Sequence, residues 1–466
     1  MRAHNWWLMI AVGLGILLNP LNSSMIAVAL PGLQQAFALD YTQVSWIIFS
    51  FYIASAIAQP VMGRASDLYG RRTIFLTGLF VALAASLLAP LSTTFGWLIV
   101  FRIVQSVGTS MMVAVGMAIV RIHVKEKQAT ALSVLSTFLS GAAAIGPFVG
   151  GMLLDWWNWR AIFFVNIPFA IGSVVLAWRV IPRDEPMSSD LKQSIRQWLI
   201  RMDAVGIILF TIGLTALLIG LLSANASATL SLPHILIGLT GCLLLFVFIR
   251  QEWHAKSPFI PLRAFIQFPA MTWVNLEFML VNLLFYSLFF GLPSYLQTVR
   301  HVSEYETGLL MLSLGLCSLA ASPFAGRWID RSGPRPALLV SALLMTFGSL
   351  WLVMLNEHSP TISVCAALAA FGVSNGLNNV GLQSVLFQSA PKEMIGVASG
   401  LFVTSRYFGT ILSSLLIGVI MGRSFSFEGF RVLSICLTIL SVSLVMLSWR
   451  RRAVRSEPDS RVNQAV

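Results

Sequence analysis

The amino-acid sequence predicts an all-α protein that crosses a membrane many times, and three observations support this fold class. Hydrophobic residues make up 57% of the 466 residues and charged residues only 10%, whereas about a quarter of the residues in soluble domains are charged. Apolar stretches of about 20 residues, long enough for a helix to cross a bilayer, recur along the chain. A charged motif that begins at Gly63 returns at Gly326, which indicates two related halves.

Each long apolar stretch is predicted to form a helix, because lipid offers no hydrogen-bond partners to an open backbone. We expect fourteen such spans, at residues 6–31, 43–63, 73–92, 95–120, 130–154, 161–181, 204–223, 232–250, 269–298, 304–326, 335–356, 360–386, 394–421 and 429–449. The first span has no small-residue cleavage site and reads LNPLNSS at its centre. We therefore expect it to be retained as a span and not removed as a signal peptide.

The positions of the basic residues predict how the chain is oriented. Most of the 30 Lys and Arg residues lie at the two termini and in every second connection, and the opposite connections hold only Arg160, Arg300, Arg423 and Arg431. Positive charge collects on the cytoplasmic side, so both termini are predicted to be cytoplasmic in a plasma (inner) membrane. The net charge of +12 then indicates anionic membrane lipids as partners, and not nucleic acid.

The sequence lacks the residue patterns of an enzyme or a metal site. Cys242, Cys317, Cys365 and Cys436 all fall in predicted spans, where a thiol packs as a small hydrophobic group. The six His residues lack ligand spacing, and no phosphate-binding loop with a lysine is present. We expect no metal, no cofactor, no catalytic residue and no ATP-driven transport by this chain alone.

The repeated motif divides the chain into two halves. Gly63, Arg64, Asp67, Gly70 and Arg72 have counterparts at a constant spacing, at Gly326, Arg327, Asp330, Gly333 and Arg335. The predicted domains are a six-helix half at 1–181, a linker with an amphipathic segment and two extra helices at 182–268, a second six-helix half at 269–450, and a basic tail at 451–466. Secondary transporters commonly consist of such repeats, with substrate held between them.

Five motifs then occur in a characteristic order, namely ALPGLQQAF, GRASDLYGRR, RIVQSVG, GAAAIGPFVGG and WNWRAIFFVNIP. With them the chain resembles the major facilitator superfamily and, within it, the fourteen-span drug:proton antiporters, over about residues 6–450. The resemblance implies a proton-coupled antiporter that exports hydrophobic or cationic drugs by alternating access. It also implies a fold of two six-helix halves with two inserted helices.

The turn after the second span is the predicted cytoplasmic gate. Glycine permits close helix approach and a tight turn, and an aspartate can face the N-terminus of a helix in the other half. In the resembling family this aspartate latches the gate, although the arginines could serve only to orient the chain. Leu68 stands where that family has a basic residue. The predicted gate residues are Gly63, Asp67, Gly70, Arg71, Arg72, Asp330, Arg331 and Arg335.

The fifth span carries small residues along one side, with a proline among them. Such residues let another helix approach closely, and a proline leaves one backbone carbonyl without its helical partner. By resemblance this is the antiporter motif, which we expect to favour exchange over leak; ordinary helix packing is the alternative. Its residues are Gly141, Gly146, Pro147, Gly150 and Gly151.

Charged residues inside spans are costly in lipid and usually functional, so Arg102, Glu277 and Arg406 are candidates for proton coupling. In the resembling family the arginine of RIVQSVG takes part in proton transfer. Asn22 stands where many such antiporters have an acid, so Glu277, the only carboxylate in the interior of a predicted span, could carry the proton, with Arg406 as a partner at similar depth. A permanently paired glutamate and a structural arginine are the alternatives.

Polar residues concentrate in the helices that line the cavity of a facilitator fold. The predicted cavity residues are Asn19, Asn22, Gln105, Asn275, Asn282, Tyr286, Asn375, Asn379 and Gln383. The last three share one helix face, although an amide stripe can also join helices. Neighbouring Phe and Met residues form adaptable walls that suit an amphipathic small molecule.

Two other functions remain open from the sequence. The chain could export or exchange one physiological solute, such as a metabolite, an amino acid or a lipid-like compound, on the same fold. The departures at Asn22 and Leu68 also leave room for a membrane sensor or scaffold that does not transport.

Overall fold

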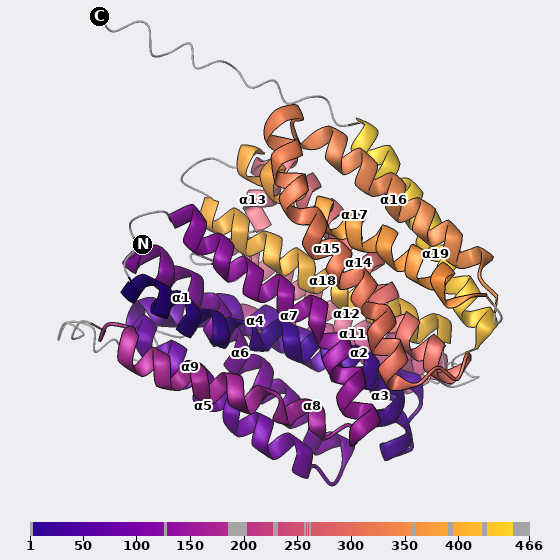
Figure 1. Cartoon of the computed structure of the whole chain (residues 1–466), viewed down its shortest axis with the longest axis horizontal. Helices are drawn as coiled ribbons and strands as arrows, with labels where there is room; N and C mark the ends of the chain where they lie inside the picture. The colour runs from indigo at the N-terminus through magenta and orange to yellow at the C-terminus, as the bar shows by residue number, and fades with distance from the viewer. Residues whose placement is uncertain are drawn as a thin grey trace, which may run out of the picture.

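A computed structural model of the protein describes residues 3–124, 128–184, 203–226, 232–255, 258, 260, 262–356, 359–389, 395–421 and 426–450. Within these ranges every regular element is a helix, so the all-α prediction is confirmed. Figure 1 shows the long helices running side by side, with the first part of the chain gathered on one side and the last part on the other. The helix α1 begins and α19 ends toward the same end of the bundle (Figure 1).

The first part of the chain forms one group of packed helices. Its elements are α1 (Ala3–Ile16), α2 (Leu18–Phe37), α3 (Tyr41–Val44), α4 (Trp46–Tyr69), α5 (Arg71–Leu88), the 3₁₀ turn η1 (Ala89–Leu91), α6 (Phe95–His123), α7 (Gln128–Trp156), α8 (Ala161–Phe164) and α9 (Asn166–Val180). The first predicted span is divided between α1 and α2. Pro20 has no N–H to offer the carbonyl of Ile16, which explains the division at this point.

The last part of the chain repeats this arrangement. It contains α13 (Leu262–Gln267), α14 (Pro269–Thr298), α15 (Glu304–Ser332), α16 (Pro334–Met354), α17 (Thr361–Ser389), α18 (Ile395–Met421) and α19 (Phe427–Arg450). The repeat seen in the sequence reappears in the backbone, because α4 and α15 are followed directly by Gly70 and Gly333, whose φ angles are +93° and +75°. Glycine adopts this conformation without strain, whereas other residues do not. The exact domain boundaries stay a prediction.

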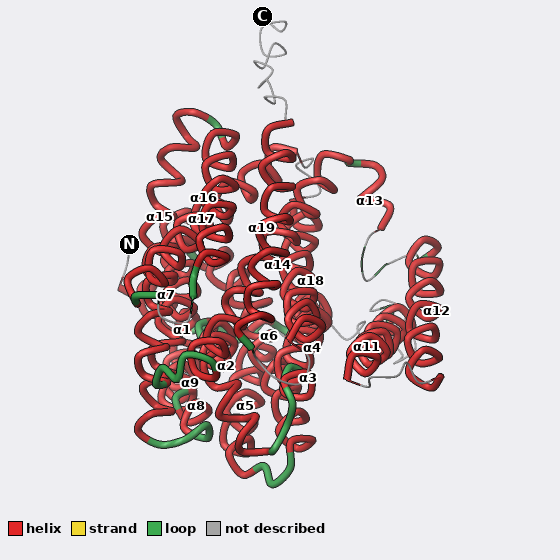
Figure 2. The backbone as a smooth tube through the Cα atoms, turned by 90° about the vertical axis from the view of Figure 1, so that its right-hand side faces the viewer, coloured by secondary structure: helices red, strands yellow, loops and turns green. Residues whose placement is uncertain are grey.

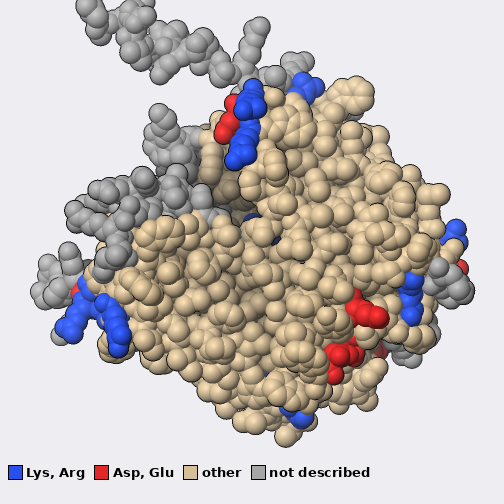
Figure 3. Space-filling model, in the orientation of Figure 1, with Lys and Arg blue, Asp and Glu red and all other residues tan. Residues whose placement is uncertain are grey.

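Thirteen helices of the described chain are long and apolar enough to cross a membrane, with α1 and α2 counted together as Asn5–Phe37. The helix α11 (Ala204–Ala226) contributes a shorter apolar stretch at Ala204–Gly220. A multi-pass membrane protein is thus confirmed, whereas a fourteenth span stays a prediction. Figure 3 shows the same division on the surface, with charged side chains near the two ends and a broad uncharged belt between them.

The two extra helices form a hairpin beside the bundle. The helix α12 (Leu232–His254) packs closely on α11, since a Cβ atom at Gly213 would lie 3.1 Å from the backbone nitrogen of Leu245. Figure 2 shows this hairpin standing apart from the other helices. Its contact with them includes the rings of Phe210 and Phe408, whose centroids are 5.7 Å apart. The expected amphipathic segment lies outside the described residues beyond position 184, as does the tail at 451–466.

Candidate functional site

Arg102 of α6 lies in a buried polar cluster of the first group of helices. Its side chain is 1% exposed, and Nη1 donates a hydrogen bond to Gln105 Oε1 at 2.7 Å. Gln105 in turn donates to Ser86 Oγ at 2.9 Å. The guanidinium carbon lies 4.4 Å from the ring centroid of Phe51, and Nε and Nη2 have no hydrogen-bond partner. Among the described residues, the arginine is therefore held by one amide and one aromatic ring and not by an acid.

Three of the seven tyrosines of the chain meet where α4 contacts α14 and α18. The ring of Tyr52 on α4 lies 5.9 Å from that of Tyr286 on α14 and 5.8 Å from that of Tyr407 on α18. Gln59, two turns along α4, donates a hydrogen bond to the hydroxyl of Tyr407. The sequence analysis selected only Tyr286. Tyr52, Tyr407 and Gln59 were missed because ring contacts between distant helices leave no local pattern.

Glu277 is 3% exposed and faces the last helix. Its Oε1 accepts a hydrogen bond from the hydroxyl of Ser448 on α19 at 3.2 Å. The contact lies between α14 and α19, both in the last part of the chain. Proton coupling by Glu277 stays a prediction, now with Ser448 as a defined neighbour.

Arg406 of α18 is half-buried and lies near Phe278, with its guanidinium carbon 5.5 Å from the ring centroid. Its Nε is buried without a hydrogen-bond partner. Within the described part of the chain, no carboxylate lies within ion-pair distance of Arg406. The structure thus places Arg406 and Glu277 on neighbouring helices but does not join them as an ion pair.

Three of the predicted cavity amides are packed between helices. Asn22, Asn275 and Asn282 are each at most 5% exposed, and each donates a hydrogen bond to a backbone carbonyl of its own helix at 2.7–2.8 Å. The Oδ1 atom of Asn22 also accepts from Asn166 at 2.7 Å. The first three bonds lie within single helices, and only the bond from Asn166 joins two helices, so contact of these amides with substrate stays a prediction.

Apart from Gln105, which is buried beside Arg102, the other predicted cavity residues are less buried. Asn19 donates to Thr109 Oγ1 at 3.1 Å, and Asn375 donates to Ser318 Oγ at 3.0 Å while accepting from Asn379 at 3.2 Å. Asn375, the first amide of the stripe on α17, thus bonds α17 to α15. Gln383, one turn beyond Asn379, is exposed.

The small residues of α7 contact two helices at once. A Cβ atom at Gly146 would overlap Ser24 of α2, and one at Gly150 would lie 3.1 Å from the backbone of Met25. On the other side, a Cβ atom at Gly151 would overlap the carbonyl oxygen of Glu304 in α15.

The contact with α15 continues along α7. A Cβ atom at Gly308 of α15 would lie 2.6 Å from the carbonyl oxygen of Pro147. Gly141, in contrast, has no such neighbour within 4 Å. The motif therefore allows one helix of the first part of the chain to lie directly against one of the last part.

A carboxylate that the sequence analysis missed holds the turn at Gly70. Asp184 accepts hydrogen bonds from the backbone N–H groups of Arg72 and Thr73 at 3.0 and 2.9 Å, at the N-terminus of α5. An acid at this position satisfies free N–H groups and complements the helix dipole. A Cβ atom at Gly70 would overlap the Asp184 carboxylate, so glycine is needed there for its size as well as its φ angle.

The repeated arginines of the gate make equivalent contacts. Arg72 donates to the carbonyl of Trp178 at 2.7 Å, and its counterpart Arg335 donates to the carbonyl of Trp449 at 3.1 Å. Gly63 has open space around it, and Asp330 and Arg331 are exposed. The side chains of Asp67 and Leu68 lie outside the described part of the structure. The latch by Asp67 therefore stays a prediction, as does the role of Arg71.

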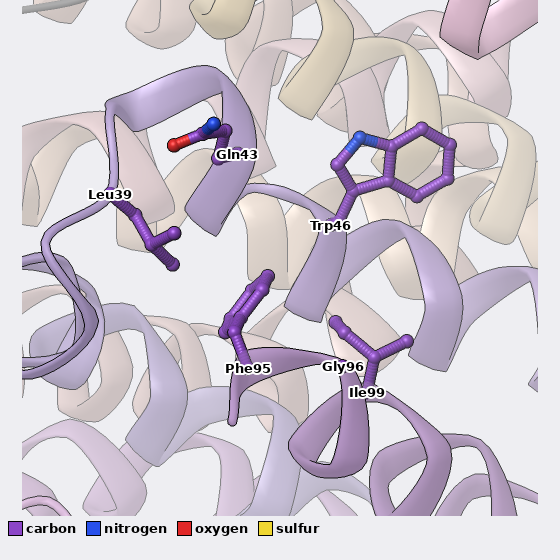
Figure 4. Close-up of a pocket in the computed structure, with 6 residues that line it drawn as sticks. All are labelled: Leu39, Gln43, Trp46, Phe95, Gly96 and Ile99. Atoms are coloured by element: carbon purple, nitrogen blue, oxygen red, sulfur yellow. The ribbon is translucent and has the colours of Figure 1, made fainter. Parts of the chain in front are cut away.

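Two surface pockets lie away from the tyrosine contacts. Figure 4 shows the first, which has a volume of about 350 Å³ and is lined by Leu39, Gln43, Trp46, Phe95, Gly96 and Ile99. The second, of about 610 Å³, lies around Phe37, Pro90, Trp159 and Arg160. Neither includes a predicted cavity residue.

Comparison with known proteins agrees with this architecture. A family model described as Major Facilitator Superfamily matches residues 12–414 and 274–464. An uncharacterized MFS-type transporter of Bacillus subtilis is 42% identical over 95% of this chain and 96% of its own length. A multidrug resistance protein B homolog of Mycobacterium tuberculosis is 29% identical over 92% of this chain and 78% of its own, and a tetracenomycin C resistance and export protein of Streptomyces glaucescens is 28% identical over 90% and 77%.

Solved structures support the fold alone. A D-xylose-proton symporter matches with a TM-score of 0.66 at 14% sequence identity, covering 96% of this chain and 98% of its own. A bacterial homolog of the human lysosomal transporter Spinster, in an inward-facing conformation, matches with a TM-score of 0.65 at 14% identity over 96% and 97%. At this level of identity the similarity concerns the arrangement of helices and not the substrate.

Proposed function

The chain belongs to the major facilitator superfamily, whose members are transporters and not enzymes, and on this basis we propose that it is a drug:proton antiporter of the fourteen-span type. It exports amphipathic, hydrophobic compounds, drugs among them, through alternating access. Both termini and the basic tail are on the cytoplasmic side of a plasma membrane, and the two halves at 1–181 and 269–450 move against each other. The linker at 182–268 joins them.

One observation carries the direction of transport in this proposal. Relatives named for multidrug resistance and for tetracenomycin C export align with about nine-tenths of this chain. Such extensive alignment includes the helices that would form the substrate path and not only the shared gate motif. Export is therefore favoured over uptake.

The helix contacts support a mechanism of alternating access. Contacts of α7 with α15 and of α4 with α18 join the first and the last parts of the chain, and each involves few polar bonds among the residues that the structure describes. A helix pair without a dense hydrogen-bond network can separate at modest cost, because mostly dispersion contacts are lost. Substrate enters from one side when one of these pairs opens and leaves when the other does.

Proton coupling is assigned to groups inside the spans. Glu277 takes up and releases the proton, and its bond with Ser448 changes as α14 moves relative to α19. Arg102 takes part through Gln105, and Arg406 provides positive charge at similar depth. Asn22 is a neutral amide paired with Asn166, so it carries no proton.

Everted membrane vesicles test this function. We expect vesicles that contain the protein to accumulate N-phenyl-1-naphthylamine, a neutral apolar dye, when respiration acidifies their interior. Nigericin, which collapses the pH gradient, should abolish the accumulation. Accumulation that persists with nigericin would rule out proton antiport, and none in either condition would count against drug export.

A second candidate is the export or exchange of one physiological solute. The B. subtilis relative at 42% identity is named only as a transporter of this superfamily. Its name indicates no drug as a substrate, although its sequence is more similar to this chain than those of the two resistance proteins. A panel of chemically unrelated dyes separates the two functions, since a drug exporter binds several of them and a dedicated exporter does not. A protein that binds dyes but moves none would fit the sensor or scaffold.

A further inference from the structure

Among the described residues, two arginines lie next to the tyrosine contacts. The ring of Phe51, on which Arg102 lies, is 5.6 Å from the ring of Tyr52, and Tyr52 contacts Tyr407, the residue next to Arg406. Two arginines therefore flank the tyrosines, one from each part of the chain. In the part of the chain that the structure describes, no carboxylate pairs with either arginine.

Arg406 points toward the interior of the bundle. Successive residues of a helix are about 100° apart, and the neighbours of Arg406 have known contacts. Ser405 bonds Asn275 of α14, Tyr407 contacts Gln59 of α4, and Phe408 faces Phe210 of the outer hairpin. The direction of Arg406 therefore lies between α14 and α4, on the side opposite to Phe408. Figure 3 shows basic atoms within a hollow of the surface, which agrees with basic groups inside the bundle.

An inward-facing guanidinium without an acid attracts an anion. It offers five N–H donors, and burial away from water makes an unpaired donor costly. The Nε of Arg406 has no acceptor, so a carboxylate, sulfonate or phosphate group could supply the missing acceptor and the countercharge together. Arginine binds such groups through two parallel hydrogen bonds, which strengthens the contact.

The aromatic residues supply the rest of the contact. Tyr52, Tyr286, Tyr407 and Phe290 form one continuous set of rings, with centroids 5.6–6.4 Å apart. Rings of this kind bind flat apolar groups through their faces and edges. A ligand with an aromatic body and one acidic group matches both features, whereas a permanent cation would be repelled by the arginines.

We propose that the facing residues of α4, α14 and α18 bind amphipathic organic anions when these helices separate, with Arg406 at the acidic group and the tyrosines against the apolar body. The proposal rests on the proposed function, because it names the substrate class of that transporter. The sequence favours hydrophobic or cationic compounds as substrates. The present proposal excludes permanent cations from the preferred substrates.

A matched pair of dyes tests the proposal. The anion 8-anilinonaphthalene-1-sulfonate and the neutral N-phenyl-1-naphthylamine share one ring system and differ in the sulfonate. Binding is measured at equilibrium with the protein in nanodiscs, after subtraction of the signal from empty nanodiscs. Ethidium serves as the cation. No ion gradient is present, so failure of proton coupling leaves the binding result unaffected.

The variants compare one interior arginine with one exterior arginine. We expect Arg406→Gln to raise the Kd of the sulfonate at least about tenfold, the usual size of a lost charged hydrogen bond, and to leave the neutral dye nearly unchanged. Arg406→Lys should retain part of the preference for the anion. Arg431→Gln, at an exposed position of α19, should behave as the parent protein.

Three results would overturn the proposal. One is an equal loss of both naphthalene dyes in Arg406→Gln, which indicates a structural role. Another is unchanged sulfonate binding in that variant. The third needs no variant, since tighter binding of ethidium than of the sulfonate by the parent protein contradicts an anion site even if Arg406→Gln fails to fold.

Discussion

Replacing Gly151 by alanine should separate α7 from α15. A Cβ atom at this position would overlap the carbonyl oxygen of Glu304 and lie 3.1 Å from the Cα of Gly308. Both neighbours are backbone atoms, which cannot rotate aside as a side chain does, so the helices themselves must move apart. Gly141 provides a matched control on the same helix, because a Cβ atom there would meet no such neighbour within 4 Å.

The size of the effect follows from this overlap. Overpacking of a well-packed contact costs about 1–3 kcal/mol. The cost falls on the conformation in which α7 and α15 touch, and a difference of this size shifts a two-state ratio by about 5- to 150-fold. Any gain in helix propensity from glycine to alanine is common to Gly151→Ala and Gly141→Ala, so their comparison isolates the contact.

Distances between spin labels measure this shift. Labels at Asp155 and Tyr305, two exposed positions near the facing ends of α7 and α15, can be placed after the four native cysteines are replaced. We expect Gly151→Ala to move population from the short to the long distance, and Gly141→Ala to match the parent. Identical distance distributions for the two variants would refute the reasoning.

Variants at other positions give the remaining predictions. Asp184→Ala should lower the free energy of unfolding by about 0.5–2 kcal/mol, because the cap on α5 is lost. The loss is measured as a lower Tm in detergent. Equal Tm values for Asp184→Ala and for Asp155→Ala, a control at an exposed position, would contradict the cap. Tyr407→Phe keeps the ring but not the hydroxyl that accepts from Gln59, so α4 and α18 should separate more often. A cysteine introduced at Val403 should then react faster with a maleimide. An unchanged rate would show that the bond does not hold α4 to α18. Glu277→Gln should retain downhill exchange of substrate in vesicles and lose gradient-driven export, and full uphill export by this variant would move coupling elsewhere. Asp67→Asn should reduce efflux at normal expression, and normal efflux by this variant would rule out the latch. Leu68→Arg should favour the outward-open state, and unchanged labelling of cytoplasmic cavity cysteines in this variant would also count against the latch.

The lengths of the apolar stretches and the repeat were sufficient to predict most of the fold. The lengths of the apolar stretches located the helices, and the spacing from Gly70 to Gly333 anticipated two turns that share a positive φ angle. The same spacing paired Arg72 with Arg335, and the structure shows them bonding equivalent carbonyls. These features depend on local sequence, which is why they could be predicted.

The candidate site was less accessible to prediction, because its contacts join distant positions. Asn22 reads as a free amide, yet it accepts from Asn166, 144 residues away. Asp184 follows α9 in the sequence but caps α5. The periodicity of α4 does not distinguish a tyrosine that faces another helix from one that faces lipid, so Tyr52 gave no signal. Residue type alone selected Arg102, Glu277 and Arg406 as candidates, since charge within a span is rare enough to stand out, and their role in proton coupling stays a prediction.

Proton movement by the purified protein tests the central claim, proton-coupled export, most directly. Proteoliposomes that contain the pH dye pyranine are given an acidic interior and are then mixed with 8-anilinonaphthalene-1-sulfonate or N-phenyl-1-naphthylamine. We predict that adding a transported dye releases protons from the lumen as the dye accumulates inside, and that protein-free liposomes show neither change. Dye accumulation without proton release, or proton release that does not depend on dye, would contradict the account.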